Sequence, residues 1–259
     1  MKLGLAGRCA VVTGASQGIG RAISIELASE GVNLALVARN GDALRELAAT
    51  LRSAHGIRVD VCAGDLAGPG MQQLLGRVSD VSGAIDIVIN NAGSTGSGNL
   101  YADDESVWKS AIDLKLMGYL RVIRHFAPGM TARRWGRIVN IIGRTGTQPE
   151  PTYLAGGAVN AALINLTRAL ARELGPSQVL VNGINPGPIV TTRWNNIIEQ
   201  RGTLQGNSGI DTHQRAINSI PLGRLGEVGE IAGMVAFLCS DRAGFVNGAI
   251  VGVDGGSTS

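Results

Sequence analysis

Short apolar runs alternate with amphipathic segments along the whole chain. The runs are rich in valine and isoleucine and are nearly continuous, which is typical of parallel strands covered on both faces. Between them, apolar residues recur at positions i, i+3 and i+4, a spacing that predicts helices. The predicted strands cover residues 9–13, 34–37, 58–62, 85–90, 137–142, 179–184 and 249–253, and the predicted helices cover 19–29, 42–54, 106–126, 158–174 and 228–239.

This alternation predicts an α/β fold with a doubly wound, seven-stranded parallel sheet and helices on both faces. Right-handed crossovers order the strands 3-2-1-4-5-6-7. A length of 259 residues fits a single domain, 1–259. Residues 187–221 have no clear periodicity and are rich in glycine, asparagine, threonine and glutamine. We therefore expect a long substrate loop or lid over 187–221.

Charge and cysteine content narrow the class of protein. A net charge of +3 with scattered arginines argues against nucleic acid as a partner. Cys9, Cys62 and Cys239 lie far apart without a CxxC pair, so we expect reduced cysteines in the core. No apolar run long enough to span a membrane is present, and the first residues do not read as a signal peptide, which predicts a cytoplasmic protein without a membrane partner. His55 and His213 have no metal-ligand partner at useful spacing, so we predict no metal site.

A glycine-rich turn joins the first predicted strand to the first predicted helix. It reads Thr13-Gly-Ala-Ser-Gln-Gly-Ile-Gly20. Glycines at such a turn let the backbone approach a pyrophosphate, and the helix N-terminus offers unpaired N–H groups and a positive dipole end to that anion. The turn therefore predicts a dinucleotide site formed by Gly14, Ser16, Gln17, Gly18, Ile19 and Gly20.

The TGxxxGxG spacing resembles the short-chain dehydrogenase/reductase family, and further signatures of that family follow in order. Asp65-Leu66 follows the third strand, Asn90-Asn-Ala-Gly93 the fourth, and Pro186-Gly-Pro-Ile-Val-Thr191 the sixth, while Gly136-Arg-Ile-Val-Asn140 lies on the fifth strand and Val253-Asp-Gly-Gly256 lies near the C-terminus. The resemblance implies a Rossmann fold, a small-molecule substrate and a homo-oligomer, tetramer or dimer. It also implies cofactor contacts from Asp65, Leu66, Asn91, Ala92, Gly93, Pro186, Gly187, Ile189 and Thr191.

The choice of nicotinamide cofactor is indicated by the end of the second strand, Val37-Ala-Arg-Asn40. An acidic residue there would accept a hydrogen bond from a ribose 2′-hydroxyl, whereas an arginine accommodates a 2′-phosphate. Ala38 stands at the acidic position and Arg39 follows, which favours NADP(H) over NAD(H). The alternative is that Arg39 is only a solvated surface cation.

The four catalytic positions of the family hold other residues in this chain. The family uses a Tyr as proton donor or acceptor, a Lys four residues later, a Ser that positions the carbonyl and an Asn on the preceding helix. In register, the Tyr position is Gly156, the Lys position is Asn160, the Ser position is Gly143 and the Asn position is Lys115. Relative to the family, Lys115 and Asn160 look like an exchange between neighbouring helices.

Our hypothesis is that Lys115 reaches the site, that Asn160 hydrogen-bonds the cofactor ribose, and that Tyr153 or Thr145 replaces the usual proton donor. Tyr153 does not satisfy Tyr-x-x-x-Lys, because Gly157 stands four residues later. The alternatives are that Lys115 is a surface or interface cation, Asn160 a helix-face polar group and Tyr153 a loop tyrosine packing near a helix start.

The substrate pocket is expected near Ser94, Arg144 and Trp194. Arg144 lies at a strand end, where ligands bind in open α/β sheets, and suits an anionic substrate. Trp194 either forms an apolar wall or packs against the body of the protein.

Three functions are consistent with these residues. The first is an NADP(H)-dependent oxidoreductase acting on a small carbonyl or alcohol with rearranged proton donors, since hydride transfer belongs to the cofactor. The second is a non-redox lyase, dehydratase or isomerase on the same scaffold. The third is a catalytically silent dinucleotide-binding sensor or structural protein. Fold alone does not decide among them.

Overall fold

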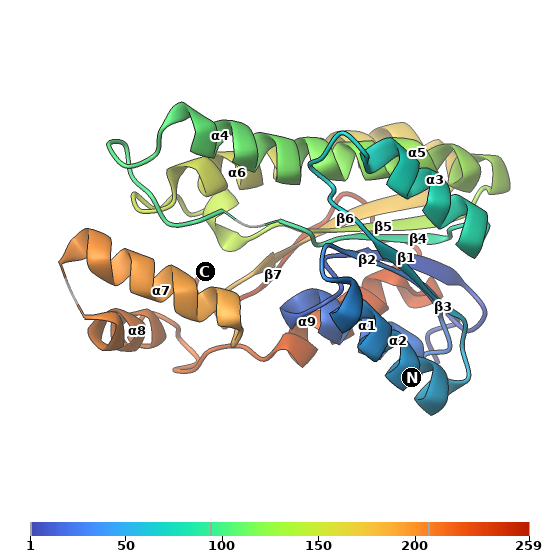
Figure 1. Ribbon diagram of the computed structural model, residues 1–259, viewed down its shortest axis with the longest axis horizontal. Helices are drawn as coiled ribbons and strands as arrows, with labels where there is room; N and C mark the ends of the chain where they lie inside the picture. Colours follow the sequence, from blue (N-terminus) through green and yellow to red (C-terminus); the bar gives the residue numbers. More distant parts are fainter. Residues whose placement is uncertain (1, 94, 207, 259) are drawn as a thin grey trace.

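The computed structural model describes residues 2–93, 95–206 and 208–258 (Figure 1). The strands form one sheet in the order β3-β2-β1-β4-β5-β6-β7, and every neighbouring pair is parallel, as predicted. The strands are β1 Cys9–Thr13, β2 Asn33–Ala38, β3 Val59–Ala63, β4 Ile87–Asn90, β5 Gly136–Ile141, β6 Val179–Pro186 and β7 Ile250–Val253.

Helices cover both faces of the sheet. One layer holds α1, α2 and α9, and the other holds α3, α4, α5 and α6, while α7 and α8 lie together beside the sheet (Figure 1). The α-helices are α1 Gly18–Ser29, α2 Gly41–His55, α3 Met71–Ser82, α4 Glu105–Ala111, α5 Gly118–Arg133, α6 Leu154–Leu174, α7 Thr192–Gln205, α8 Gly209–Asn218 and α9 Val228–Cys239, with a π-helix η1 Ile112–Met117 and 3-10 turns η2 Arg144–Gly146, η3 Gly175–Ser177 and η4 Asp241–Ala243.

Alternate residues of the central strand fill two separate cores. Ala10 and Val12 of β1 belong to the core with α1, α2 and α9, whereas Cys9 and Val11 belong to the core with α3 and α5. Because successive side chains of a strand point to opposite faces, a strand buried on both sides has an unbroken apolar sequence. Cys9, Cys62 and Cys239 are buried and free, as expected.

The long amphipathic segment 106–126 is not one α-helix. The chain runs through α4, then the π-helical turn η1, then α5. A π-turn contains one extra residue, which shifts the residues after it around the helix axis relative to those before it. Matching the whole segment to a single i, i+3, i+4 pattern did not detect this shift. This turn carries Lys115, which is therefore aimed inward toward β5 and α6.

The segment 187–221 is also not the irregular loop that we expected. It forms α7 and α8, each of which begins at a capping hydroxyl: Thr191 accepts a hydrogen bond from the backbone N–H of Trp194, and Ser208 from that of Asp211. These caps are the local signal that the absence of hydrophobic periodicity concealed. The helix α3 was likewise not predicted, and α6 begins at Leu154 rather than at residue 158.

One stretch, Leu154–Ser177, is long and apolar enough to cross a membrane by length and composition alone. Half of its most apolar window is buried, and α6 packs against β6. These contacts are those of a core helix.

Candidate active site at the carboxyl edge of the sheet

The turn between β1 and α1 forms a cradle that only glycine fits. Gly14 and Gly18 have φ values of +68° and +55°, which side chains rarely adopt. A Cβ atom at Gly20 would overlap the carbonyl oxygen of Gly14. The backbone of the turn is therefore uncovered on the side where α1 begins.

The end of β4 holds this cradle in place. Thr13 Oγ1 accepts hydrogen bonds from the backbone N–H groups of Asn91, at 2.9 Å, and Ala92, at 3.1 Å. The Asn91 side chain donates to the carbonyl oxygens of Thr13 and Gly14, at 3.1 and 3.3 Å. Asn91 and Ala92, predicted to contact the cofactor, thus also fix the shape of the turn that would receive it.

These residues fit the diphosphate of a dinucleotide. At the start of α1, the side chain of Gln17 makes no capping hydrogen bond within the described part of the chain, so the first-turn N–H groups are left for an anion. Arg39 is exposed directly after β2, and the exposed Asp65 and buried Leu66 follow β3. All three lie at the same sheet edge as the cradle, because the carboxyl ends of parallel strands meet there.

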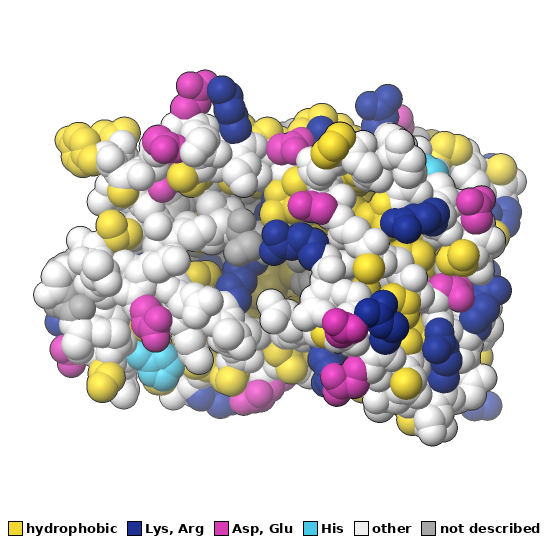
Figure 2. All heavy atoms as spheres, viewed as in Figure 1, with side chains coloured by type: hydrophobic (Ala, Val, Ile, Leu, Met, Phe, Trp, Pro, Cys, Tyr) yellow, Lys and Arg dark blue, Asp and Glu magenta, His cyan; other side chains and the backbone are white. Residues whose placement is uncertain are grey.

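A cavity of about 160 Å³ opens beside the cradle. Figure 2 shows a hollow in this face of the molecule, with Lys and Arg side chains along it. Residues predicted for the site that line the cavity are Ile19, Asn91, Lys115, Gly143, Arg144, Thr145, Tyr153, Asn160, Pro186, Gly187, Ile189, Thr191 and Trp194. The other predicted residues do not line it, and Ser94 lies outside the described residues.

Lys115 is buried at the floor of this cavity, with 6% of its surface exposed. Its Nζ donates to the carbonyl oxygen of Ile142 at 2.5 Å and to Asn160 Oδ1 at 2.7 Å. Burial, with a smaller contribution from Arg193, lowers the pKa of Lys115 well below its usual value. The alternative that Lys115 is a surface or interface cation is therefore wrong.

Asn160 connects Lys115 to Thr145. Its Oδ1 accepts the hydrogen bond from Lys115 Nζ, and its Nδ2 donates to Thr145 Oγ1 at 2.8 Å. Asn160 is 3% exposed, so this polar group on a face of α6 is buried. Gly143 makes room for this chain of contacts, since a Cβ there would lie 2.8 Å from Asn160 Nδ2 and the backbone φ is +135°.

Tyr153 is the N-cap residue of α6 and packs against the start of this helix, as in the alternative interpretation, and it also lines the cavity. It is 7% exposed, and its hydroxyl oxygen accepts a hydrogen bond from Arg193 Nη2 at 3.0 Å. Its ring lies against Gly156, where a Cβ atom would overlap Cε1 and Cζ of the ring. The phenol of residue 153 and a side chain at residue 156 thus exclude one another.

Three arginines surround the outer part of the cavity. Arg144 and Arg201 both form ion pairs with Glu150, and Arg193 donates to the carbonyl oxygen of Gly93. Arg193 and Arg201 were not predicted. They lie eight residues apart on α7, on the same side as Ile197, so the prediction of that helix would have placed them together.

Trp194 forms part of the cavity wall and is 8% exposed, and its Nε1 is buried without a hydrogen-bond partner among the described residues. The structure thus combines the two alternatives for Trp194, because the ring is buried and also lines the cavity.

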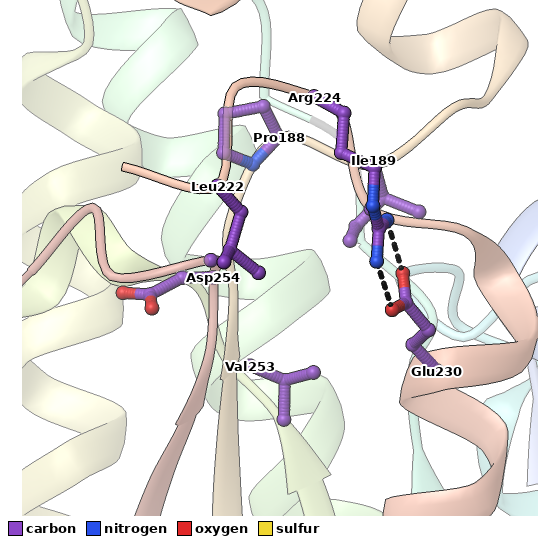
Figure 3. A pocket seen from close by; sticks show the side chains of 9 residues that line it. Pro188, Ile189, Leu222, Arg224, Glu230, Val253 and Asp254 are labelled. Carbon is purple, nitrogen blue, oxygen red and sulfur yellow. Dashed lines mark hydrogen bonds and ion pairs between the residues drawn. The ribbon is translucent and has the colours of Figure 1, made fainter. Parts of the chain in front are cut away.

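A second, smaller cavity of about 40 Å³ lies between the segment after α8 and the start of α9 (Figure 3). The side chains of Arg224 and Glu230 meet there in a two-pronged ion pair, with distances of 2.9 and 2.7 Å. Glu230 also accepts the backbone N–H of Glu227 and so caps α9. This cavity is too small for a substrate and its polar groups are paired, so the larger cavity is the candidate site. No group of three or more His, Cys, Asp or Glu placed to hold a metal ion occurs in the described ranges.

Comparisons with known proteins agree with this geometry. The profile of the family described as Enoyl-(Acyl carrier protein) reductase matches residues 14–258. The chain is 36% identical to the 3-oxoacyl-(acyl-carrier-protein) reductase FabG of Pseudomonas aeruginosa over an alignment of 262 residues, which covers 98% of each protein.

Solved structures are similar over the same length. The L-sorbose reductase from Gluconobacter frateurii, complexed with NADPH and L-sorbose, has a TM-score of 0.91 and 33% identity, with 98% of each chain covered. An NAD⁺-bound xylitol dehydrogenase has a TM-score of 0.91 and 29% identity, with 97% of this chain and 99% of the other covered.

Proposed function

From the premise that this chain belongs to the short-chain dehydrogenase/reductase family, we propose that it is an NADP(H)-dependent oxidoreductase of small carbonyl or alcohol substrates. Its proton donors differ from those of the family pattern. The observation that carries this proposal is the position of Tyr153: its phenol enters the cavity and covers Gly156, the residue at the family's tyrosine position. In this proposal Tyr153 supplies the phenol at the site, although residue 156, the family's tyrosine position, is a glycine.

The cofactor would be held by the cradle and by the strand ends on either side of it. Backbone N–H groups at the start of α1 would bind the diphosphate, and Arg39 would bind a 2′-phosphate. The G. frateurii enzyme was solved with NADPH and the xylitol dehydrogenase with NAD⁺, so the preference for NADP(H) rests on Arg39. When bound, the nicotinamide supplies or accepts the hydride.

Tyr153 would supply the proton in the direction of reduction. Its oxygen already accepts a hydrogen bond from Arg193, so its own hydrogen is free to be donated to a carbonyl oxygen in the cavity. The proton of Tyr153 would form the new O–H bond on the carbonyl oxygen, whose C=O π-bond would break as the carbon gains the hydride that the cofactor supplies. The phenolate that remains is stabilised by the guanidinium 3.0 Å away.

Lys115, Asn160 and Thr145 would position the reacting carbonyl. The lysine fixes the amide of Asn160, which in turn donates to Thr145 Oγ1, so the hydroxyl hydrogen of Thr145 is left to point at substrate. This chain of contacts replaces the serine that the family has at residue 143. Lys115 thus acts through Asn160 and Thr145 as a positioning residue.

The test is a binding assay followed by a turnover assay. NADPH fluorescence titration should give saturable binding, and NADH should bind more weakly. A panel of small ketones, aldehydes and alcohols with NADPH or NADP⁺ should then show cofactor oxidation or reduction. Binding without hydride exchange for any member of the panel would instead favour a silent cofactor-binding protein, and loss of substrate without a cofactor change would favour a non-redox enzyme.

A homo-oligomer, dimer or tetramer, in the cytoplasm is also part of this proposal. The proposal rests on the family, and the fully exposed Phe245, five residues before β7, offers a surface position at which to test self-association near the C-terminal strand. Sedimentation of the wild type and of Phe245→Ser would test it, since the variant should shift toward the monomer.

A further inference from the structure

The cavity is strongly cationic. Of the described residues that line it, Lys115, Arg144, Arg193 and Arg201 carry basic side chains and none is acidic. The only acidic side chain that an ion pair connects to these residues is that of Glu150, among the described contacts. Two arginines therefore share a single carboxylate, and the Arg144–Arg201–Glu150 group has an excess of one positive charge.

Arg201 has unused hydrogen-bonding capacity. Its side chain is 12% exposed and pairs with Glu150 Oε2 at 2.7 Å, yet its Nε is buried without a partner in the described part of the chain. An unsatisfied buried donor on a cation is costly, and native structures rarely keep one unless a ligand or water completes it. Burial also removes this cation from water and thereby lowers the pKa of Arg201.

Arg193 lines the cavity together with Arg201 and contacts the proposed proton donor. It uses N–H groups for the carbonyl oxygen of Gly93 and for Tyr153, and a guanidinium has five N–H donors. With Trp194 and Ile197 on the same helix, α7 presents a basic and partly apolar wall to the cavity.

We infer that the substrate is a small carbonyl or alcohol compound with an oxyanion group, a carboxylate or a phosphate, which Arg201 and Arg193 bind. Guanidinium groups match both anions, often through two parallel hydrogen bonds. The anion would take up the free donors of Arg201 and place the reacting carbon beside Tyr153, and Glu150 would compete with it for Arg144 and Arg201. The placement of the reacting carbon beside Tyr153 rests on the proposed function, whereas the binding of the anion by the two arginines does not.

Binding of matched probe pairs to the NADP⁺ complex would test the inference, because the oxidised cofactor prevents reduction during the measurement. Calorimetry would compare acetoacetate with the neutral acetoacetamide, and dihydroxyacetone phosphate with dihydroxyacetone. We expect at least one anion to bind about tenfold or more tightly than its neutral partner. The probe pair that shows this preference identifies the anionic group of the substrate as a carboxylate or a phosphate.

Two variants separate a binding role of the arginines from a structural one. Arg201→Gln should abolish the preference for the anion, whereas Glu150→Gln should strengthen anion binding because it frees two guanidinium groups. Arg215→Gln, on the exposed side of α8, should bind like the wild type. If Arg201 only supports the fold, both Arg201→Gln and Glu150→Gln weaken binding together.

Equal affinity for charged and neutral probes, or an unchanged preference in Arg201→Gln, would overturn the inference, even in an active NADP(H)-dependent enzyme. If NADP⁺ does not bind, the proposed function fails, and the same probe pairs titrated against the cofactor-free protein still decide the question of the anion. Absence of any probe binding there also overturns the inference.

Discussion

The cradle and the floor of the cavity (Lys115, Gly143, Tyr153, Gly156 and Asn160), at the same edge of one sheet, use glycine in opposite ways. In the cradle, Gly20 lets the backbone of Gly14 approach α1 and leaves the turn without a covering side chain at that point. On the floor, Gly143 and Gly156 make room for side chains from elsewhere, the amide of Asn160 and the phenol of Tyr153. The first region carries the glycine pattern on which the resemblance to the family rests, whereas for the second we propose an altered set of functional side chains.

The difference is that the side chains on the floor depend on one another in pairs. Lys115 requires an acceptor at residue 160, and Asn160 requires the space at residue 143. Tyr153 requires the space at residue 156. A backbone cradle depends on the path of the chain and tolerates little variation, whereas an arrangement of side chains has more than one solution with the same functional groups.

The largest effect is expected from Tyr153→Phe, which removes the proposed proton donor and keeps the ring over Gly156. The turnover number should fall by about 10²- to 10⁴-fold, the usual contribution of a general acid. NADPH affinity should stay the same. Steady-state kinetics with NADPH titration would measure both, and Tyr101→Phe, a change at a fully exposed tyrosine, serves as the control. A Tyr153→Phe enzyme with wild-type turnover would assign proton donation to another group.

Alanine at one glycine of each region would separate the two uses directly. Gly20→Ala overlaps the Gly14 carbonyl and should weaken NADPH binding about 10- to 100-fold, because overpacking costs about 1–3 kcal/mol. Gly156→Ala displaces the Tyr153 ring and should lower turnover with little effect on NADPH affinity. Gly229→Ala in α9, where a Cβ meets no atom within 4 Å, should change neither. The comparison fails if Gly20→Ala and Gly156→Ala give the same profile.

Lys115→Met would test the buried amine through the pH dependence of stability. The folded-state pKa of Lys115 lies well below 10.5, so between these two values the unfolded chain binds a proton that the folded chain does not. The free energy of unfolding of the wild type, relative to the variant, should therefore rise with pH across this window, by at most about 1.4 kcal/mol per pH unit, and this advantage should be lost as pH falls. Denaturant titrations at several pH values would measure the difference. A flat difference would mean that Lys115 remains charged in the folded protein.

The smallest effect is expected from Arg39→Ser. Removal of an exposed cation at the end of β2 should weaken NADPH binding about tenfold and leave NADH binding nearly unchanged. Arg172→Ser, an exposed arginine on α6, is the matched control. Equal loss of both cofactors would indicate that Arg39 acts only through general charge.

Local pattern alone was sufficient for most of the fold. The seven strands, their order and six of the nine α-helices in the described ranges follow from apolar runs, helical spacing and right-handed crossovers, with α4 and α5 predicted as one helix. The cradle from Gly14 to Gly20 was also predicted, because its requirement is a short run of glycines between a strand and a helix. Both are properties of neighbouring residues, which a sequence records directly.

Tertiary structure alone decided which side chains meet at the floor. Lys115 and Asn160 are 45 residues apart, and their contact depends on a π-turn that periodicity does not reveal. Arg193 and Arg201 became part of the site only through α7, a helix marked by the Thr191 cap and not by an apolar stripe. The physical reason is that side-chain chemistry depends on distances and burial across elements, and these are set by packing after the local elements have formed.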